Sequence, residues 1–269
     1  MYLKYLILSL IFFFSSCAFN DLQEQKDYEI YDVKNDKKLL FNDFIDHLSN
    51  YDVVLLGEEH DVYKHHIAEA KILSALSSIK KINVALEMLS VDKQEIIDKA
   101  LENKQNIKPK DIKKSLNWDK KWHQKGYYEV LESFFYKDTM ITAANLTNEE
   151  IMTIYNGAEK ISGLESTTKD VKNRIEDIIK NNHSIDDITL EKLVQIQQYK
   201  DRRMADVLVQ SNIFSVLIAG KYHCYKNIGV PLHIKDFKSY KRVAVVSFEN
   251  EKDFKDIDEK VTDFVWIFK

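Results

Sequence analysis

Glycine and proline are scarce in this sequence: only 6 Gly and 2 Pro occur among 269 residues. Both residues mark turns and loops, so their scarcity favours a helix-rich protein with short connections. The sequence contains no internal repeat and no low-complexity block. The formal net charge is only -4, and acidic and basic residues are interleaved along the chain. No basic stripe is present, which argues against a nucleic acid as partner.

No apolar run near the N-terminus is long enough to cross a bilayer, which requires about 20 residues in a helix. The run from Tyr5 to Phe14 follows the single charge of Lys4 and precedes Ser15, Ser16 and Cys17. A basic start, a short apolar run and small residues are typical of a secretory signal. We therefore predict that residues 1–16 are removed and that Cys17 is lipidated. The alternative is an ordinary signal peptide cut near Ala18.

Cysteine is also scarce, and Cys224 is the only other one. If Cys17 carries a lipid, no intrachain disulfide can form, and a chain of this length can be stable from its core alone. Residues 17–27 are predicted to be a tether between the lipid and the folded body. The anchor predicts a location on the periplasmic side of the cell envelope. Ala18, rather than Asp, favours the outer membrane.

Several short apolar runs do not alternate with polar residues, which is typical of parallel strands buried on both faces. Helical patterns lie between them, so we predict an α/β fold with a mostly parallel sheet and flanking helices. The run from Phe264 to Phe268 is expected to add an edge strand. The predicted buried strands are Val53 to Leu56, Ile82 to Leu86, Met140 to Ala144, Phe214 to Ala219 and Val243 to Val246.

The strand pattern is interrupted between Ala144 and Phe214, where only helical patterns occur. Residues 92–125 form a second polar, helix-rich insert. We predict that residues 92–125 and 157–210 form one smaller, all-helical subdomain over an edge of the sheet. The α/β domain then comprises residues 28–91, 126–156 and 211–269.

Each predicted strand ends in polar residues. The first ends in Gly57, Glu58, Glu59 and His60; the others end in Glu87, in Asn145, and in Gly220 with His223. The carboxyl ends of parallel strands lie at one edge, where ligands bind. His60, Glu87, Asn145 and His223 are therefore expected to converge there. Of His65 and His66, one is expected to point back to this edge and the other to face solvent.

The chemistry of these residues leaves several possibilities open. His and Glu are metal ligands, but their spacing is not the HExxH pattern. Glu and His can also perform acid–base hydrolysis. The Gly-x-Ser-x-Gly elbow of serine hydrolases is absent, and Cys224 is expected to be buried rather than a nucleophile. Alternatively, each polar residue merely caps its strand.

Tyrosine is abundant, with 14 residues, and a tyrosine phenolate can hold haem iron. A flat apolar cofactor also needs an aromatic slot and cations for its propionates. The insert places several suitable side chains near the same edge: Tyr155, His183, Tyr199 and Lys200.

Taken together, these motifs resemble the ChaN family of iron-regulated haem-binding lipoproteins. The resemblance extends from about Tyr51 to Ile234 and includes the lipoprotein signal. It is carried by Gly57-Glu58-Glu59-His60-Asp61 with His65-His66, Glu87-Met88, Asn145-Leu146, Ile154-Tyr155-Asn156-Gly157, Gly220-x-x-His223 and Gly229-Val230-Pro231.

The resemblance implies haem uptake together with an outer-membrane receptor. It also implies haem at a homodimer interface, held by a tyrosine on iron with a His and a Lys of the partner subunit near the propionates. Tyr155 is our candidate for the iron ligand, with Tyr128 and Tyr222 as alternatives. His183 and Lys200 are the candidates near the propionates. Lys200 departs from the Arg that usually precedes the equivalent of Asp201.

A wider resemblance leads to a second hypothesis. Two Gly-x-x-His motifs also mark the TraB/TIKI-type metal-dependent proteases and erythromycin-esterase-like enzymes. By that resemblance, His60, Glu87 and His223 would serve a metal-dependent hydrolase. A third possibility is an anchored scaffold without a ligand. The haem-binding hypothesis implies no catalytic residue.

Overall fold

The structure is a computed structural model, and it describes residues 25–182, 186–251 and 257–269. The predicted signal, the lipidation site Cys17 and His183 lie outside the described residues. Within them, no helix combines the length and the apolar character needed to cross a membrane.

One eight-stranded sheet forms the centre of the protein, with strand order β2-β1-β8-β7-β3-β6-β4-β5. Six neighbouring strands, from β8 to β5, run parallel, while β1 and β2 pair antiparallel at one end. The predicted mostly parallel α/β fold is therefore confirmed. The strands are β1 (Tyr28–Asp32), β2 (Lys37–Leu39), β3 (Val53–Glu58), β4 (Ile82–Ser90), β5 (Thr139–Asn145), β6 (Ser215–Gly220), β7 (Val243–Asn250) and β8 (Phe264–Phe268).

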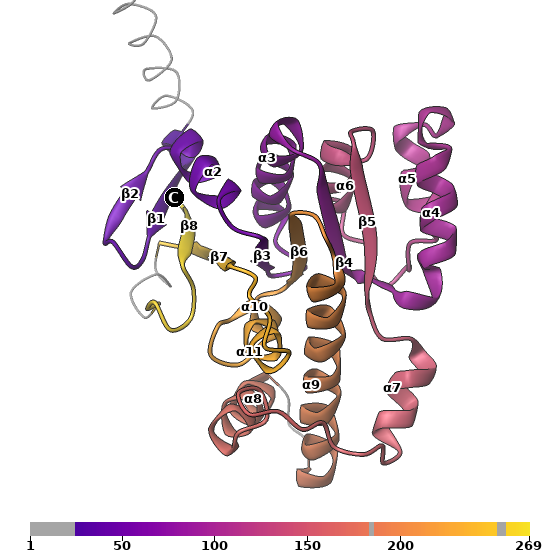
Figure 1. Cartoon of the computed structure of the whole chain (residues 1–269), viewed down its shortest axis with the longest axis vertical. Coiled ribbons are helices and arrows are strands. Elements are labelled where there is room, and N and C mark those ends of the chain that lie inside the picture. The colour runs from indigo at the N-terminus through magenta and orange to yellow at the C-terminus, as the bar shows by residue number, and fades with distance from the viewer. Residues whose placement is uncertain (1–24, 183–185, 252–256) are drawn as a thin grey trace, which may run out of the picture.

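Helices cover both faces of this sheet (Figure 1). The helices are α2 (Phe41–Ser49), α3 (Tyr63–Ile79), α4 (Gln94–Glu102), α5 (Ile112–Ser115), α6 (Tyr127–Phe134), α7 (Asn148–Tyr155), α8 (Lys169–Asn182), α9 (Asp187–Gln210), α10 (Lys221–Cys224) and α11 (Val230–Asp236). Short 3₁₀ turns are η1 (Gln25–Asp27), η2 (Val91–Lys93), η3 (Lys104–Asn106) and η4 (Pro109–Asp111).

The alternation of side chains along each strand divides the core into two layers. In β3, Val54 and Leu56 pack with α2, α3 and α6, whereas Val53 and Leu55 pack on the other face with α9 and α11. Apolar residues are thus needed at every position of the strand, which explains the continuous apolar runs of the sequence.

The prediction for the last strand was wrong in one respect. β8 is not an edge strand, because it lies between β7 and β1, and all five of its side chains are buried. Tyr28 of β1 stacks on Trp266 of β8, with ring centroids 4.1 Å apart. An entirely apolar strand such as Phe264–Phe268 needs cover on both sides, and the short β1–β2 hairpin provides it.

The two helical inserts pack on different faces of the sheet rather than against each other. Ile97, Ile112 and Leu116 of residues 92–125 join the core beneath α3 and α6. Residues 157–210 instead form a small core between α8 and α9, and the C-terminal half of α9 covers the opposite face. The single helical subdomain that we expected is therefore divided, because each amphipathic insert packs on its own face of the sheet.

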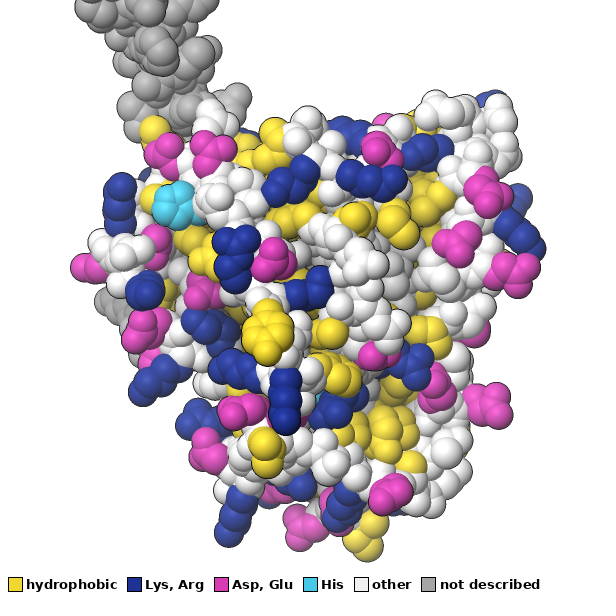
Figure 2. Space-filling view, in the orientation of Figure 1, with side chains coloured by type: hydrophobic (Ala, Val, Ile, Leu, Met, Phe, Trp, Pro, Cys, Tyr) yellow, Lys and Arg dark blue, Asp and Glu magenta, His cyan; other side chains and the backbone are white. Residues whose placement is uncertain are grey.

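Charges of both signs are interspersed over the face seen in Figure 2, with no extended basic area. This distribution agrees with the interleaved charges of the sequence.

Candidate functional site

The carboxyl ends of three adjacent strands, β3, β6 and β4, bring His60, His223 and Glu87 together. Glu87 is the centre of this group. One carboxylate oxygen, Oε1, lies 3.3 Å from Nε2 of His223, and the other, Oε2, lies 3.7 Å from Nε2 of His60. The backbone N–H of Gly220 donates to Oε2 at 2.9 Å. We call His60, Glu87, His223 and Lys200 the rim site.

An irregularity in β4 places Glu87 in this position. The pairing of β4 with β6 ends at Leu86, and the register with β5 shifts between Leu86 and Ser90. Such irregularities re-aim side chains and occur often beside functional sites. Glu87 is 2% exposed but remains ionised. Burial raises its pKa, but His223, Lys200 and His60 outweigh that effect and hold the pKa well below its usual range.

His223 lies between two carboxylates. Its Nδ1 is 2.5 Å from Oδ1 of Asp201 on α9, and the Gln197 side chain is 2.9 Å from the same nitrogen. Burial lowers the pKa of His223, but Glu87 and Asp201 outweigh burial and raise it to about 9. The pKa of Asp201 is raised to about 6, because burial and the charge of Glu87 exceed the effect of His223. His223 is therefore an oriented imidazolium near neutral pH.

His60 is oriented by a second acid. Its Nδ1 lies 2.8 Å from Oε1 of Glu58 and 3.0 Å from the hydroxyl of Tyr127, which itself donates to Glu58 at 2.5 Å. The ring of Trp122 packs on His60, with centroids 4.6 Å apart. Burial lowers the pKa of His60, but the Glu58 hydrogen bond and the Glu87 and Glu58 charges raise it overall.

Gly220 is required for space rather than for a turn. Its φ of -54° is available to any residue. A Cβ at this position would lie 3.1 Å from Nε2 of His60 and 3.7 Å from Glu87. The glycine therefore allows the imidazole to approach the end of β6.

The rim site combines an ionised acid with two imidazoles that are each held by a second carboxylate. This arrangement can bind a polar or anionic group at the histidines and can transfer protons. Within the described residues, however, the rim donors do not gather as closely as metal ligands. The one group of three or more ligand atoms within 4.8 Å of one another there is Glu58, His66 and Glu69.

This second group, the rear cluster of Glu58, His66 and Glu69, lies behind His60. Nε2 of His66 is 2.8 Å from Oε2 of Glu58, and all three side chains are buried. His65 is buried as well: it accepts a hydrogen bond from the backbone N–H of Glu59 at 3.0 Å and stacks on Phe268. The expectation of one solvent-facing histidine was therefore wrong, because both lie on the sheet side of α3.

Of the other predicted rim residues, Asn145 contacts Glu87 only through the backbone. Its amide donates to the Glu87 carbonyl at 2.8 Å, so it ties β5 to β4 instead of facing the rim. Lys200 does reach the rim, with Nζ 3.7 Å from Oε1 of Glu87. Cys224 is fully buried and its pKa is raised by burial and nearby acids, as expected for a packing residue.

The tyrosines proposed for iron lie on different surfaces. Tyr155 ends α7 and is half-buried, with Nζ of Lys192 4.1 Å from its ring centroid. Tyr128 is exposed on α6, with Nζ of Lys113 4.3 Å from its ring. Tyr222, on α10, is exposed and packs edge-on against Tyr225.

The sequence interpretation missed three residues of the sites: Tyr127, Asp201 and Glu69. Each is a polar residue within the apolar stripe of its helix. In α6 the buried positions are Tyr127, Val130, Leu131 and Phe134, a helical spacing that turns Tyr127 inward and Tyr128 outward. Reading each stripe for its polar members would have identified all three.

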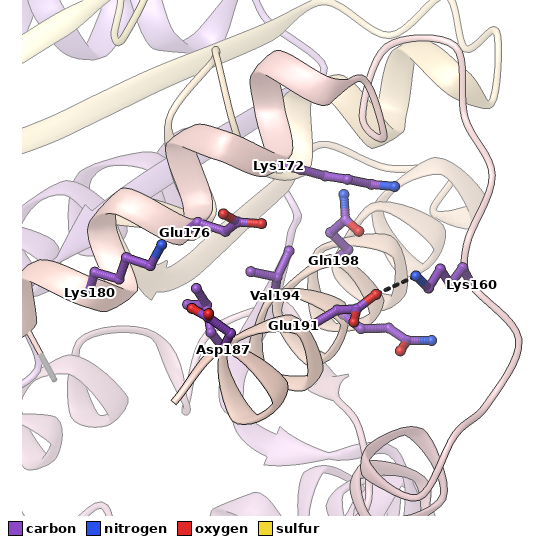
Figure 3. Close-up of a pocket in the computed structure, with 10 residues that line it drawn as sticks. Lys160, Lys172, Glu176, Lys180, Asp187, Glu191, Val194 and Gln198 are labelled. Atoms are coloured by element: carbon purple, nitrogen blue, oxygen red, sulfur yellow. Dashed lines mark hydrogen bonds and ion pairs between the residues drawn. The ribbon is translucent and has the colours of Figure 1, made fainter. Parts of the chain in front are cut away.

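Two cavities in the described residues are lined mainly by charged and amide side chains. One of about 310 Å³ adjoins Glu87 and is lined by charged and amide side chains, including Asp92, Lys121 and Asn145. Another of the same size lies between α8 and α9, and none of the four rim-site residues lines it (Figure 3). Lys160 pairs with Glu191 across its mouth.

Comparison with known proteins identifies the family. The family described as haem-binding uptake, Tiki superfamily, ChaN matches residues 44–234. The chain belongs to the ChaN family. A solved structure of cofacial haem binding to ChaN of Campylobacter jejuni is 44% identical, covers 91% of this chain and 98% of that chain, and superposes with a TM-score of 0.85.

More distant solved structures have lower sequence identity and lower TM-scores. The type III effector HopBA1 is 13% identical over 84% of this chain and 91% of its own, with a TM-score of 0.48. The RRSP effector domain of a Vibrio vulnificus toxin is 14% identical over 76% of this chain and 35% of its own, with a TM-score of 0.44. Likenesses this weak carry no functional argument. A search of curated proteins found no significant match.

Proposed function

We propose that this ChaN-family chain binds haem for uptake and that Tyr155 ligates the iron. The observation that carries the proposal is the uncommitted phenol of Tyr155 at the end of α7. Among the described residues, its hydroxyl has no hydrogen-bond partner, whereas the hydroxyl of Tyr127 donates to Glu58 and that of Tyr199 to the carbonyl of Glu159. A ferric haem iron can be held by a phenolate.

The surroundings of Tyr155 fit an apolar, anionic cofactor. Met152, one helical turn earlier on the same side of α7, is 54% exposed, and Ile188 at the start of α9 is 73% exposed. Exposed apolar side chains of this size favour a ligand or partner surface. The ammonium of Lys192 lies 4.1 Å from the centroid of the Tyr155 ring and can neutralise a propionate. When bound, haem would supply a ferric iron that the phenol oxygen of Tyr155 could hold.

A second copy of the chain would complete the site. A flat cofactor lying on Tyr155 has one face uncovered, and both 310 Å³ cavities are lined mainly by charged and amide side chains. Homodimerisation would cover that face, which is consistent with the cofacial haem binding of the Campylobacter jejuni relative. His183 and Lys200 remain our predicted residues for the propionates across the interface, and Tyr128 and Tyr222 remain the alternative ligands.

The test is a haemin titration followed by absorption spectroscopy and sedimentation velocity. We expect a high-spin ferric spectrum with the charge-transfer band of a phenolate ligand, together with a shift from monomer to dimer. Tyr155→Phe keeps the ring and removes the hydroxyl, so it should abolish the band while the circular dichroism spectrum stays unchanged.

Tyr128→Phe and Tyr222→Phe are the matched controls and should titrate like the wild type. Loss of the band in either control, with Tyr155→Phe unaffected, would move the iron ligand to that residue. Haemin that changes neither the spectrum nor the sedimentation of the wild type would refute haem binding.

We further propose that the protein is a lipoprotein anchored through Cys17 on the periplasmic side of the outer membrane, where it would receive haem from an outer-membrane receptor. The sequence of residues 1–18 supports this location.

The rim site favours a second candidate function, hydrolysis. Glu87 is flanked by two imidazoles, and Asp201 orients His223 as a carboxylate orients the histidine of a hydrolytic triad. An esterase or peptidase that uses this pair as a general base would require the imidazole of His223, so hydrolysis of a substrate panel should be lost in His223→Asn. Activity that persists in this variant would count against the rim site as the catalytic centre.

A further inference from the structure

The rear cluster behind the rim site gathers buried polar atoms that make no hydrogen bond. In the described part of the chain, thirteen buried side-chain nitrogen and oxygen atoms lack a hydrogen bond, and five of them lie here. They are Oε2 of Glu58, both ring nitrogens of His66 and both carboxylate oxygens of Glu69. An unsatisfied buried polar group costs free energy, about 1–3 kcal/mol each and more when charged. Two of the five, Oε2 of Glu58 and Nε2 of His66, lie within ion-pair distance of each other. Both oxygens of the fully buried Glu69 and Nδ1 of His66 make no hydrogen bond, and together they indicate a missing occupant.

The three side chains come from two elements that converge. Glu58 ends β3, and His66 and Glu69 lie at i and i+3 on α3, which places both on one face of that helix. In Figure 1, α3 lies beside β3 near the centre of the sheet. One ligand atom from each residue lies within 4.8 Å of the other two. Glu69 is 0% exposed, so its carboxylate cannot be solvated from outside.

The charges also indicate a cation. Two buried carboxylates, Glu58 and Glu69, face each other, and like charges in a buried site repel unless a proton or a cation lies between them. Oε1 of Glu58 is committed to Tyr127 and His60 on the rim side, while Oε2 faces the cluster. Nε2 of His66 is 2.8 Å from that oxygen but is not aligned for a hydrogen bond.

Space for the His66 ring is provided by a glycine. Gly126 precedes α6 with φ -59° and ψ -20°, a conformation open to any residue. A Cβ there would nevertheless lie 2.2 Å from Nδ1 of His66. The absence of a side chain at Gly126 therefore leaves room for the imidazole of His66, and the backbone conformation does not require glycine.

We propose that Glu58, His66 and Glu69 bind one divalent transition-metal ion, such as Zn²⁺. One imidazole nitrogen and two carboxylate oxygens form a donor set that suits this class of ion, and water would complete the coordination. The ion has a structural role and is separated from the rim site by the side chain of Glu58. Because Glu58 also orients His60, the ion positions that imidazole indirectly.

The experiment measures the zinc content of the purified protein by mass spectrometry after refolding with Zn²⁺ and exhaustive dialysis. We expect about one equivalent per chain in the wild type. Glu69→Gln preserves the shape but removes the anionic ligand, so Zn²⁺ affinity should fall by ~100-fold or more. His223→Asn is the matched control, since it alters the rim site and should retain the metal.

Zinc lost in His223→Asn but retained in Glu69→Gln would place the ion at the rim and overturn the proposal. A zinc-free wild type after reconstitution would also overturn it and would indicate a proton shared by Glu58 and Glu69. Anomalous diffraction from wild-type crystals at the zinc edge needs no variant. A peak among Glu58, His66 and Glu69 would support the proposal even if Glu69→Gln fails to fold, whereas a peak elsewhere would refute it.

Discussion

The stability of this protein should fall as the pH rises from neutral, because of His223. Its ordinary pKa of 6.5 is raised to about 9 by Glu87 and Asp201, against the opposing effect of burial. A group whose pKa is higher in the folded state stabilises the fold fully below its unfolded pKa. That contribution is therefore complete below pH 6.5 and is lost as the pH passes through about 9.

The magnitude follows from the size of this shift. At 1.36 kcal/mol for each tenfold change in proton affinity, the rise from 6.5 to about 9 corresponds to roughly 3 kcal/mol. His223 is only 7% exposed, so solvent screening does not greatly reduce this value. The charge of Glu87, 3.3 Å away, is the largest of the effects that raise this pKa. Glu87→Gln should therefore remove about 2 kcal/mol of the pH-dependent contribution of His223 to the free energy of unfolding.

The assay is urea unfolding followed by circular dichroism at several pH values between 6 and 9.5. We expect the wild type to be more stable than Glu87→Gln at pH 6.5 and the difference to shrink as His223 loses its proton. The pKa of Glu87 lies well below 4.5, so Glu87 itself stays ionised throughout this window. A histidine NMR titration should show a lower pKa for His223 in the variant.

Glu95→Gln is a suitable control, because Glu95 is an exposed acid paired with Lys99 on α4. It removes the same charge without touching the rim and should leave the wild-type pH profile intact. A wild-type free energy of unfolding that stays constant between pH 6.5 and 9 would contradict this role of His223. A free energy of unfolding that falls as steeply with pH in Glu87→Gln as in the wild type would contradict it too.

Two further predictions concern helix capping and the anchor. Thr147 and Glu150 form a reciprocal cap at the start of α7, the helix that carries Tyr155. Thr147→Ala should therefore lower the free energy of unfolding by ~1 kcal/mol in the same urea assay. Thr153→Ala, at an exposed position of the same helix, should have little effect. Cys17→Ser should abolish incorporation of labelled fatty acid and release the protein from the membrane fraction, and labelling that persists in the variant would refute lipidation at this residue.

The strand pattern was readable from the sequence because parallel strands are buried on both faces. The runs from Val53 to Leu56 and from Val243 to Val246 have no polar position, and the other three have one each. All five lie in strands except for Phe214, which precedes β6. The hairpin β1–β2 was not predicted, because its strands are short and β2 exposes both lysines. Its role in covering β8 depends on contacts between the two ends of the described chain.

The approach of His60, Glu87 and His223 also followed from the sequence, since strand ends in a parallel sheet share an edge. The side chains that orient these residues could not be predicted from the sequence. Asp201 lies 22 positions before His223, and its contact requires α9 to pack across the sheet. Likewise, the inward turn of Tyr127 and Glu69 is set by which side of each helix meets the core.

The sequence by itself determined the local features of this protein: the buried strands, the polar residues that end them and the helices between them. These depend on side-chain periodicity and on chain direction, which neighbouring residues specify. The tertiary structure alone decided which acid orients each imidazole, that the buried Glu69 carboxylate makes no hydrogen bond, and which face each insert covers. Those features arise from the packing of helices on a twisted sheet, where contacts between distant segments set burial and charge.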